Sequence, residues 1–113
     1  MPFIDTKTNV KITDDAKERL AKEFGKAIEL IPGKSERWLM LNFSDECKMS
    51  FSGSFSPCAI SEVKVLGKAD AESYQNLTKK LTEIFEQVLS IPSDRVFIKY
   101  DEYSLWGHNG ANF

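Results

Sequence analysis

The chain has 113 residues, with 42% hydrophobic and 28% charged residues, which is an ordinary globular composition and predicts one domain over residues 1–113. The net charge is -2, and the lysines and arginines alternate with acidic residues, which argues against nucleic acid as the main partner. No apolar run approaches the roughly 20 residues that span a bilayer, so we expect no membrane partner.

The N-terminus and the cysteines indicate the compartment. Asp5 and Lys7 interrupt any apolar stretch that could act as a signal peptide. Cys47 and Cys58 are too few and too isolated to form a disulfide framework, which is typical of a reducing environment. We therefore expect a cytoplasmic protein.

The first half of the chain predicts a strand, a helix and a second strand. Residues 1–10 alternate in character, as in a strand, and Thr13 then precedes a helix with two acidic residues in its first turn. The apolar positions of this helix share one face: Ala16, Leu20, Phe24, Ala27, Ile28 and Ile31. Pro32-Gly33 ends the predicted helix, and residues 37–45 form the second predicted strand.

The second half repeats this order. Residues 46–56 are rich in Ser and Gly and indicate a hairpin or linker, and residues 57–66 predict a third strand. A helix follows from about Asp70, and its apolar face consists of Tyr74, Leu77, Leu81, Ile84, Phe85 and Val88. Residues 91–94 turn the chain into a last strand over residues 95–101, before a polar and aromatic tail.

Two strand–helix–strand units with right-handed crossovers predict an α/β (α+β) fold, a four-stranded mixed sheet with both helices on one face. Two sets of apolar residues suit the helix-covered face: Leu39, Leu41 and Phe43, and Val96, Ile98 and Tyr100. The opposite face carries a mixed set: Trp38, Met40, Asn42, Phe97 and Lys99. Because no further segment is left to cover that face, we expect the chain to self-associate.

Short segments along the whole chain resemble one known family. They are Met1-Pro2, Pro32-Gly33-Lys34 with Trp38 after it, residues 49–54 (MSFSGS), residues 56–59 (SPCA), Leu66-Gly67-Lys68, residues 93–96 (SDRV) and residues 107–110 (GHNG) near Phe113. In order and spacing, this set is similar to the macrophage migration inhibitory factor family of the tautomerase superfamily. The resemblance implies a homotrimer with active sites at the subunit interfaces and sheets that line a central channel.

The resemblance makes Pro2 the catalytic residue. Proline after an initiator Met permits Met1 removal, which leaves a secondary amine on a rigid ring. A free α-amine has a pKa of about 7.7–8.0, and apolar walls together with a nearby cation lower it. A base whose pKa lies near the working pH is efficient. The mechanism requires that Met1 is removed, because the nitrogen of Pro2 is otherwise part of an amide.

The resemblance also implies a set of substrate-binding residues. Lys34 matches the contact to the substrate carboxylate, whereas residue chemistry alone would make it a lysine near a helix C-terminus. Leu66 matches a position that contacts substrate through backbone and side chain, and Val65 precedes it. For both of these residues, ordinary strand core is the alternative.

Phe97 and Lys99 depart from the pattern that the resemblance implies. Mammalian cytokine members of the family carry Tyr and Asn there, and those side chains enter the active site of the neighbouring subunit. Phe97 keeps the ring but lacks the hydroxyl, so it cannot donate a hydrogen bond or a proton. Lys99 either binds a substrate carboxylate or carbonyl, or it points into the central channel.

The remaining candidates are aromatic residues and one histidine. Trp38, Trp106 and Phe113 correspond to positions around the family's pocket mouth, and packing at the trimer interface is their alternative. His108 replaces a family aromatic residue, and we expect an ordinary surface histidine. No Cys, Asp or second His completes a ligand set with it, so we expect no metal and no cofactor.

The resemblance implies two classes of function. The first is a keto–enol tautomerase of the phenylpyruvate or dopachrome type, acting on a small aromatic α-keto or enol acid. The alternative is a cytokine-like or host-modulating protein with vestigial catalysis that binds a receptor, and members of that kind are released without a signal peptide. Cys58 lacks a second Cys at Ser61, so we expect a buried strand cysteine rather than a redox site.

Overall fold

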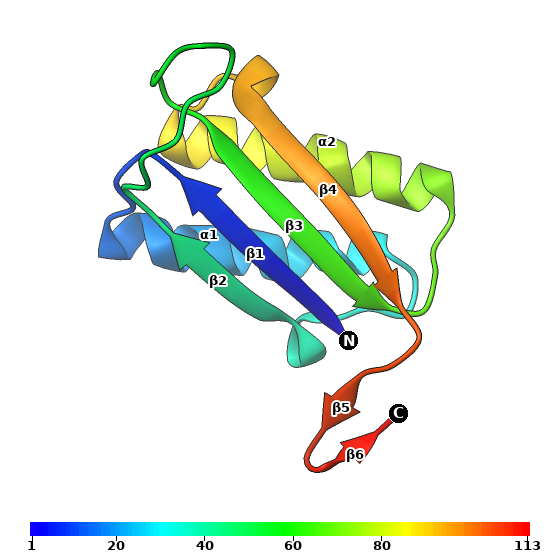
Figure 1. Ribbon diagram of the computed structural model, residues 1–113. Helices are drawn as coiled ribbons and strands as arrows, with labels where there is room; N and C mark the ends of the chain where they lie inside the picture. Colours follow the sequence, from blue (N-terminus) through cyan, green and yellow to red (C-terminus); the bar gives the residue numbers. More distant parts are fainter.

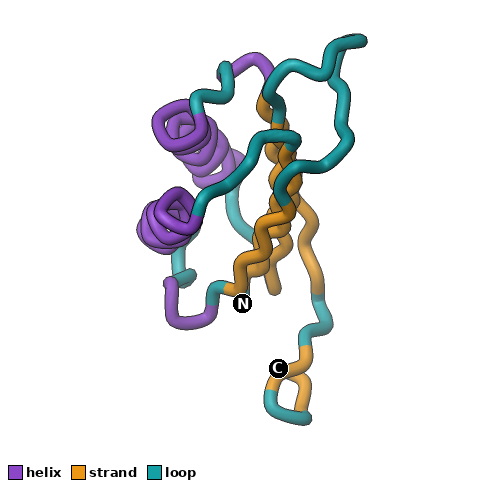
Figure 2. The backbone as a smooth tube through the Cα atoms, turned by 90° about the vertical axis from the view of Figure 1, so that its left-hand side faces the viewer, coloured by secondary structure: helices purple, strands orange, loops and turns teal.

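The computed structural model describes residues 1–113 and consists of a four-stranded sheet with two helices on one face, plus a small hairpin (Figures 1 and 2). The strands and helices are β1 (Pro2–Thr8), α1 (Asp14–Ala27), β2 (Met40–Ser44), β3 (Ala59–Leu66), α2 (Ala71–Leu89), β4 (Val96–Tyr103), β5 (Gly107–His108) and β6 (Ala111–Asn112). The short 3-10 turns are η1 (Ile28–Leu30), η2 (Glu36–Trp38) and η3 (Ser93–Arg95). Neither α1 nor α2 has the length and hydrophobicity that a membrane span requires.

The sheet has the strand order β2-β1-β3-β4. Strands β1 and β2 are parallel, β3 and β4 are parallel, and β1 is antiparallel to β3. One helix joins each parallel pair, so the chain consists of two β-α-β units that meet at β1 and β3. Both helices lie behind the same face of the sheet (Figure 2). The predicted mixed sheet with two helices on one face is confirmed.

Both helices begin where the capping residues predict. The Thr13 hydroxyl accepts a hydrogen bond from the Ala16 amide, and the Asp70 carboxylate accepts one from the Ser73 amide at 2.7 Å. Helix α1 ends at Ala27, earlier than predicted, because the chain tightens into η1 before it reaches Pro32. Helix α2 ends at Ser90, which takes a left-handed conformation with φ of 55°.

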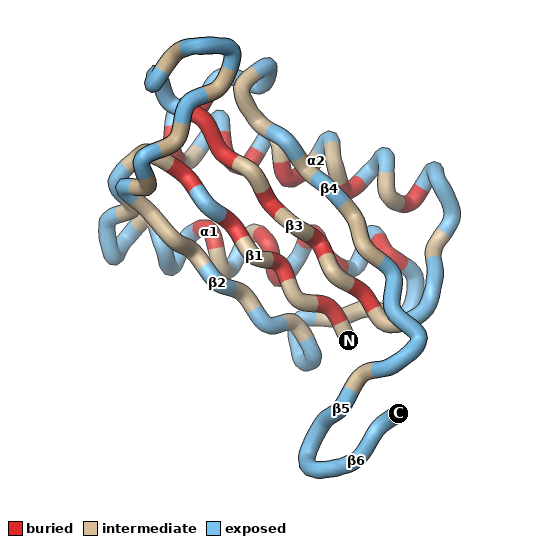
Figure 3. Tube along the Cα trace, viewed as in Figure 1, coloured by how far each residue is buried: buried red, intermediate tan, exposed pale blue.

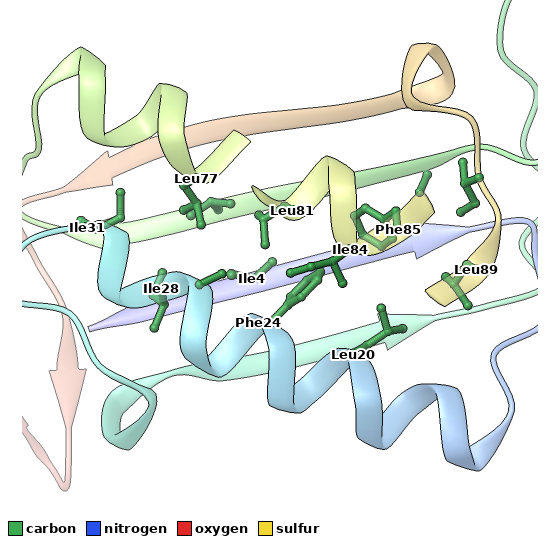
Figure 4. Close-up of a cluster of buried hydrophobic side chains, with 14 of the residues drawn as sticks. Ile4, Leu20, Phe24, Ile28, Ile31, Leu77, Leu81, Ile84, Phe85 and Leu89 are labelled. Carbon is green, nitrogen blue, oxygen red and sulfur yellow. The ribbon is translucent and has the colours of Figure 1, made fainter. Parts of the chain in front are cut away.

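The core lies between the helices and the sheet (Figure 4). Fully buried side chains from both helices, among them Leu20, Phe24, Leu81 and Phe85, pack onto Ile4 of β1. The two strand sets that were predicted to face the helices, one in β2 and one in β4, pack against this cluster. Aromatic contacts add to the packing, since the Phe24 and Phe85 rings lie 5.5 Å apart edge to face.

The second strand is shorter than predicted. Residues 37–45 were expected to form it, but η2 occupies Glu36–Trp38 and the strand begins at Met40. Trp38 is therefore not on a strand face, and its ring is presented by a tight turn instead. Alternation along the sequence could not distinguish the start of a strand from a 3-10 turn, because a turn of three residues is too short to show a period of its own.

The open face of the sheet, turned away from the helices, is more polar than predicted. Buried and less buried residues alternate along β1 and β3 (Figure 3). Charged residues of β1, β3 and β4 alternate with buried ones and fill its centre: Asp5, Lys7, Glu62, Lys64, Lys99 and Asp101. Lys99 lies 3.8 Å from both Glu62 and Asp101, and Lys64 lies 3.6 Å from Glu62. Met40 and Phe97 are 67% and 53% exposed, so the exposure predicted for these two residues is confirmed.

The tail forms a projecting arm that the sequence did not reveal. Strand β4 continues to Tyr103, and residues 104–113 then leave the sheet and fold into the β5–β6 hairpin (Figure 1). Asn109 and Gly110 both take positive φ at its turn. The hairpin lies near the end of the sheet where β1 begins, which brings the two ends of the chain into the same region (Figures 1 and 2).

Candidate active site

Pro2 is the first residue of the central strand β1 and is buried. It pairs with Val65 on the antiparallel neighbour β3. The carbonyl oxygen of Met1 accepts a hydrogen bond from the Leu66 amide at 3.0 Å, and this carbonyl belongs to the same peptide group as the Pro2 nitrogen. The Pro2 nitrogen is thus fixed by the sheet register rather than by a mobile terminus.

Lys34 reaches this region from the turn after η1. Gly33 takes a φ of 81°, and the Lys34 amide donates to the Ile31 carbonyl at 3.1 Å, so the turn directs the lysine back towards the sheet. Its Nζ atom donates to the Leu66 carbonyl oxygen at 2.7 Å. The structure therefore brings Lys34, Leu66 and the residue before Pro2 together.

The local environment favours a neutral amine at the N-terminus. Burial, the charge of Lys34 and a hydrogen bond with the Lys34 side chain, in that order of size, together lower the pKa of the Met1 amine from 8.0 to about 6. A group with a pKa of about 6 is mostly neutral at pH 7. This end of β1 is thus a place where an amine can accept a proton.

A cavity of about 220 Å³ opens at Pro2. Its lining residues come from β1, η2, β2 and the arm: Met1, Pro2, Phe3, Trp38, Met40, Trp106, Gly107 and His108. The Trp38 ring lies 5.0 Å from the His108 ring and 6.2 Å from the Phe113 ring. Predicted site residues Pro2, Trp38 and Trp106 thus meet at one cavity, and Phe113 packs behind it.

Two predicted site residues lie far from Pro2 within the single chain. Phe97 pairs with Ile60 and Lys99 pairs with Glu62, whereas Pro2 pairs with Val65. Five residues of β3 separate Ile60 from Val65, which corresponds to about 16 Å along a strand. One chain alone therefore does not bring Phe97 to the Pro2 cavity.

Val65 and Leu66 have different surroundings. Val65 is 1% exposed and belongs to the core cluster, which corresponds to the strand-core alternative for its side chain. Leu66 is half-buried, and both of its backbone polar groups take part in hydrogen bonds beside Pro2.

A second cavity, of about 160 Å³, lies at the other end of β3 and includes Cys58, Phe97 and Arg95 in its lining. Arg95 donates to the carbonyl oxygens of four residues, Pro57, Phe51, Ser54 and Ser56, so its guanidinium serves the loop before β3. This cavity offers no proton acceptor comparable to the amine at the first one.

The cysteines do not form a redox pair. Cys58 is buried, as predicted. The Cys47 amide donates to the Thr8 carbonyl, and the Thr8 hydroxyl donates to the Cys58 carbonyl at 2.7 Å, so the two cysteines flank β1 on opposite sides. Two strand spacings of about 4.8 Å exceed the Cα separation that a disulfide bridges.

His108 is a titratable residue at the cavity that was not predicted as a site residue. It is exposed, as expected of a surface histidine, but it also lines the cavity with Pro2, and its ring stacks against Phe113 at 6.0 Å. The signal that could have identified His108 as a cavity residue was its position in the chain, because other members of the family carry an aromatic residue there. No cluster of three or more His, Cys, Asp or Glu side chains is arranged to hold a metal ion.

Comparison with known proteins identifies the family. The family model described as "Macrophage migration inhibitory factor (MIF)" matches residues 1–113. The chain belongs to the macrophage migration inhibitory factor family. It is 30% identical to macrophage migration inhibitory factor of Xenopus laevis over 115 residues, which cover 100% of this chain and 99% of that protein.

Solved structures of this family share the fold over their whole length. Leishmania major MIF2 superposes with a TM-score of 0.94 at 29% identity, covering 100% of this chain and 97% of that one. The macrophage migration inhibitory factor homologue of Prochlorococcus marinus gives a TM-score of 0.89 at 33% identity, with 98% of each chain covered. Membership in this family, within the tautomerase superfamily, supports an isomerase or cytokine-like function in general terms.

Proposed function

We propose that this protein is a keto–enol tautomerase whose catalytic base is the amine of Pro2 after Met1 is removed. The observation that carries the proposal is the position of Pro2, buried at the start of β1, with the Lys34 ammonium held at this end of the sheet by the Leu66 carbonyl at 2.7 Å. The same surroundings lower the pKa of the Met1 amine to about 6. The substrate class is a small aromatic α-keto acid or its enol, of the phenylpyruvate or dopachrome type.

Removal of Met1 prepares two groups at once. It converts the Pro2 nitrogen from an amide to a secondary amine. It also removes the Met1 carbonyl that accepts the Leu66 amide hydrogen, so this N–H becomes a free donor next to the new amine. A free backbone donor beside a base suits a substrate oxygen on which negative charge develops.

The causes that lower the pKa of the Met1 amine apply to Pro2 as well. Pro2 is buried, and Lys34 is held near this end of β1 by its hydrogen bond to Leu66. Both effects disfavour an ammonium ion. The Pro2 amine is then neutral at pH 7. From the keto form it takes a proton from the carbon next to the carbonyl and delivers it to the carbonyl oxygen, and from the enol form it carries a proton from that oxygen back to the carbon.

Lys34 has free capacity for the substrate carboxylate. An ammonium group offers three donors, and once Met1 and its amine are removed, the hydrogen bond to the Leu66 carbonyl accounts for one of them. The aromatic rings of Trp38 and Trp106 in the cavity, with Phe113 behind, suit an aromatic side chain on the substrate.

The same proposal includes a homotrimer with shared active sites. Phe97 and Lys99 lie on the open face, displaced from Pro2 along the strand direction by about 16 Å and about 10 Å respectively, so we expect them to contribute to a site when a second copy places them against its cavity. Light scattering at micromolar concentration should give three times the chain mass. A stable monomer would contradict the shared site.

The decisive experiment compares processed protein with protein that retains Met1. Intact mass assigns the two forms, and enol-to-keto conversion is followed spectrophotometrically. Removing the base should cost roughly 10² to 10⁴ in rate, the usual contribution of one positioned proton carrier. The oligomeric state is checked in both forms.

The pH profile gives an independent readout. In processed protein, kcat should rise with pH through a pKa below the free-amine value of about 8, because the neutral amine is the active form. Lys34→Ala should weaken substrate binding and raise that pKa. If the processed and Met1-retaining forms catalyse equally well, Pro2 is not the base. If neither is active, the receptor-binding alternative gains support.

A further inference from the structure

His108 is a titratable group at the Pro2 cavity that the proposed mechanism does not use. It is the single histidine of the chain. Its ring is held between two aromatic side chains, edge to face against Trp38 at 5.0 Å and stacked with Phe113 at 6.0 Å. An imidazole fixed in this way meets a ligand in a defined position.

The backbone of the arm fixes His108 as well. His108 pairs with Ala111 across the β5–β6 hairpin, and the Phe113 amide donates to the Trp106 carbonyl at 3.1 Å. These contacts close the hairpin on itself, while Trp38 anchors it to η2. His108 is exposed, and its imidazole lies at the solvent-facing side of the cavity lining, positioned by the two rings and by the hairpin.

The charges around the imidazole are mainly positive. Lys34 lies at the β1 end, where its ammonium donates to the Leu66 carbonyl, and the Arg37 guanidinium lies 5.4 Å from the Trp38 ring. The Lys64 ammonium lies 6.0 Å from the ring of Phe3, another lining residue. None of the residues that line the cavity is acidic.

The acidic groups of the neighbouring elements are engaged or peripheral. Asp101 pairs with Lys99, and Glu102 accepts hydrogen bonds from Tyr74 and the Ala69 amide. Glu36 lies beside Arg37 on η2 and approaches Gly25 of α1. The carboxyl group of Phe113 follows the ring that stacks on His108. The cavity lining itself thus carries no acidic side chain, and the cations Lys34 and Arg37 lie in its neighbourhood.

We propose that His108 is a specificity-determining residue that strengthens the binding of carboxylate ligands in the Pro2 cavity when its imidazole is protonated. The inference rests on the proposed function, because it assumes that an acidic substrate enters this cavity. A neutral imidazole offers one N–H donor, whereas imidazolium offers two donors and a positive charge. Histidine ordinarily changes between these forms at pH 5 to 8.

The consequence is opposed pH dependence of binding and catalysis. Lower pH protonates His108 and tightens carboxylate binding, so KM for an acid falls. The same change protonates the Pro2 amine, which lowers kcat because the base is lost. A merely structural histidine would leave KM independent of its own titration.

The first test uses the single histidine as a spectroscopic probe. The imidazole proton signal of His108 is titrated by NMR with and without saturating 3-phenylpropanoate, a carboxylate without a keto group. By linkage, a tenfold preference for the protonated form raises the titration midpoint by about one pH unit. The matched neutral control, 3-phenylpropanamide, should leave the midpoint unchanged.

Each outcome of this test bears on the inference. An upward shift of about 0.5 to 1 unit with the acid alone supports it, since this corresponds to a roughly three- to tenfold preference. No shift at saturation, an equal shift with the amide, or no binding of the acid overturns it. The result does not depend on which group is the base, so it is distinguishable from failure of the Pro2 mechanism.

The second test is kinetic and uses His108→Phe, which keeps an aromatic ring against Trp38 and Phe113. In the unmodified chain, KM for an α-keto acid should rise about three- to tenfold between pH 6 and pH 8, in line with that linkage. In the variant, the rise of KM between pH 6 and pH 8 should be smaller, because only the titration of the Pro2 amine then contributes to it. The pH profile of kcat should keep its shape in both proteins. An unchanged pH dependence of KM in the variant overturns the inference.

Discussion

The two faces of the sheet are built from the same strands but have opposite chemistry. The covered face carries fully buried side chains, such as Ile4 and Val63, that pack against both helices. The open face carries the ion-paired charges of β1, β3 and β4, with Met40 and Phe97 exposed beside them. Alternate residues of one strand therefore serve different purposes.

The difference shows where the chain is free to vary without losing its fold. On the covered face, every side chain is constrained by neighbours from α1 and α2, so a change of volume affects stability. On the open face, the side chains are constrained only by partly exposed ion pairs, which contribute little. Substitutions there report on binding and association instead.

The largest expected effect is a stability difference between the faces, measured on one strand. Ile4→Ala should lower the free energy of unfolding by about 2–5 kcal/mol, because Ile4 is fully buried and its removal leaves a cavity. The matched control is Lys7→Ala on the open face of the same strand, which should cost less than about 1 kcal/mol.

Denaturant unfolding at a fixed protein concentration measures both variants, since association would otherwise shift the midpoint. Equal destabilisation by the two variants would show that the open face is packed as firmly as the covered one.

A second effect tests the polar pair inside the covered face. The hydroxyl groups of Thr6 and Ser61 lie 2.6 Å apart, and both residues are fully buried. Thr6→Val should cost about 1–3 kcal/mol of unfolding free energy, because it leaves the Ser61 hydroxyl without a partner.

The double variant Thr6→Val/Ser61→Ala should recover much of that loss, since no unpaired group remains. Strictly additive losses in the double-mutant cycle would mean that the two hydroxyls do not depend on each other.

The smallest stability effect is expected at Lys99 on the open face. Its side chain is 53% exposed and its ion pairs are 3.8 Å long, so Lys99→Ala should change the unfolding free energy by less than about 1 kcal/mol. If Lys99 contacts substrate from a neighbouring copy, the variant should raise KM for an acidic substrate severalfold. It should leave KM for the methyl ester nearly unchanged.

The ester serves as the control because it lacks the charge that Lys99 would bind. Equal effects on the acid and the ester would instead indicate that Lys99 faces the central channel.

Local signals account for the parts of the fold that could be predicted. The start of the first helix after Thr13 was predicted because a side-chain oxygen beside a free backbone N–H is a contact within one turn, and the second helix was predicted to begin at about Asp70, which the structure shows to be its cap. The two helix faces follow from spacing alone. The η2 turn and the β5–β6 hairpin were not predicted, because two or three residues carry too little periodicity to identify an element.

The candidate site was predicted in part, from the family resemblance rather than from local sequence signals. Pro2, Lys34, Leu66 and Trp38 were named through the family resemblance, and the structure brings them to one end of β1. His108 was assigned to the surface, since its neighbours in sequence give no indication of a cavity. Its contact with Trp38 joins residues that are 70 positions apart.

The sequence by itself determined the order of the main elements and the apolar faces of both helices, because each depends on neighbours within a few residues. Only the tertiary structure decided that Pro2, Lys34 and His108 share one region. The β1–β3 register fixes the first, the Gly33 turn directs the second, and the projecting arm carries the third. Such long-range juxtapositions arise from packing, which local sequence patterns do not encode.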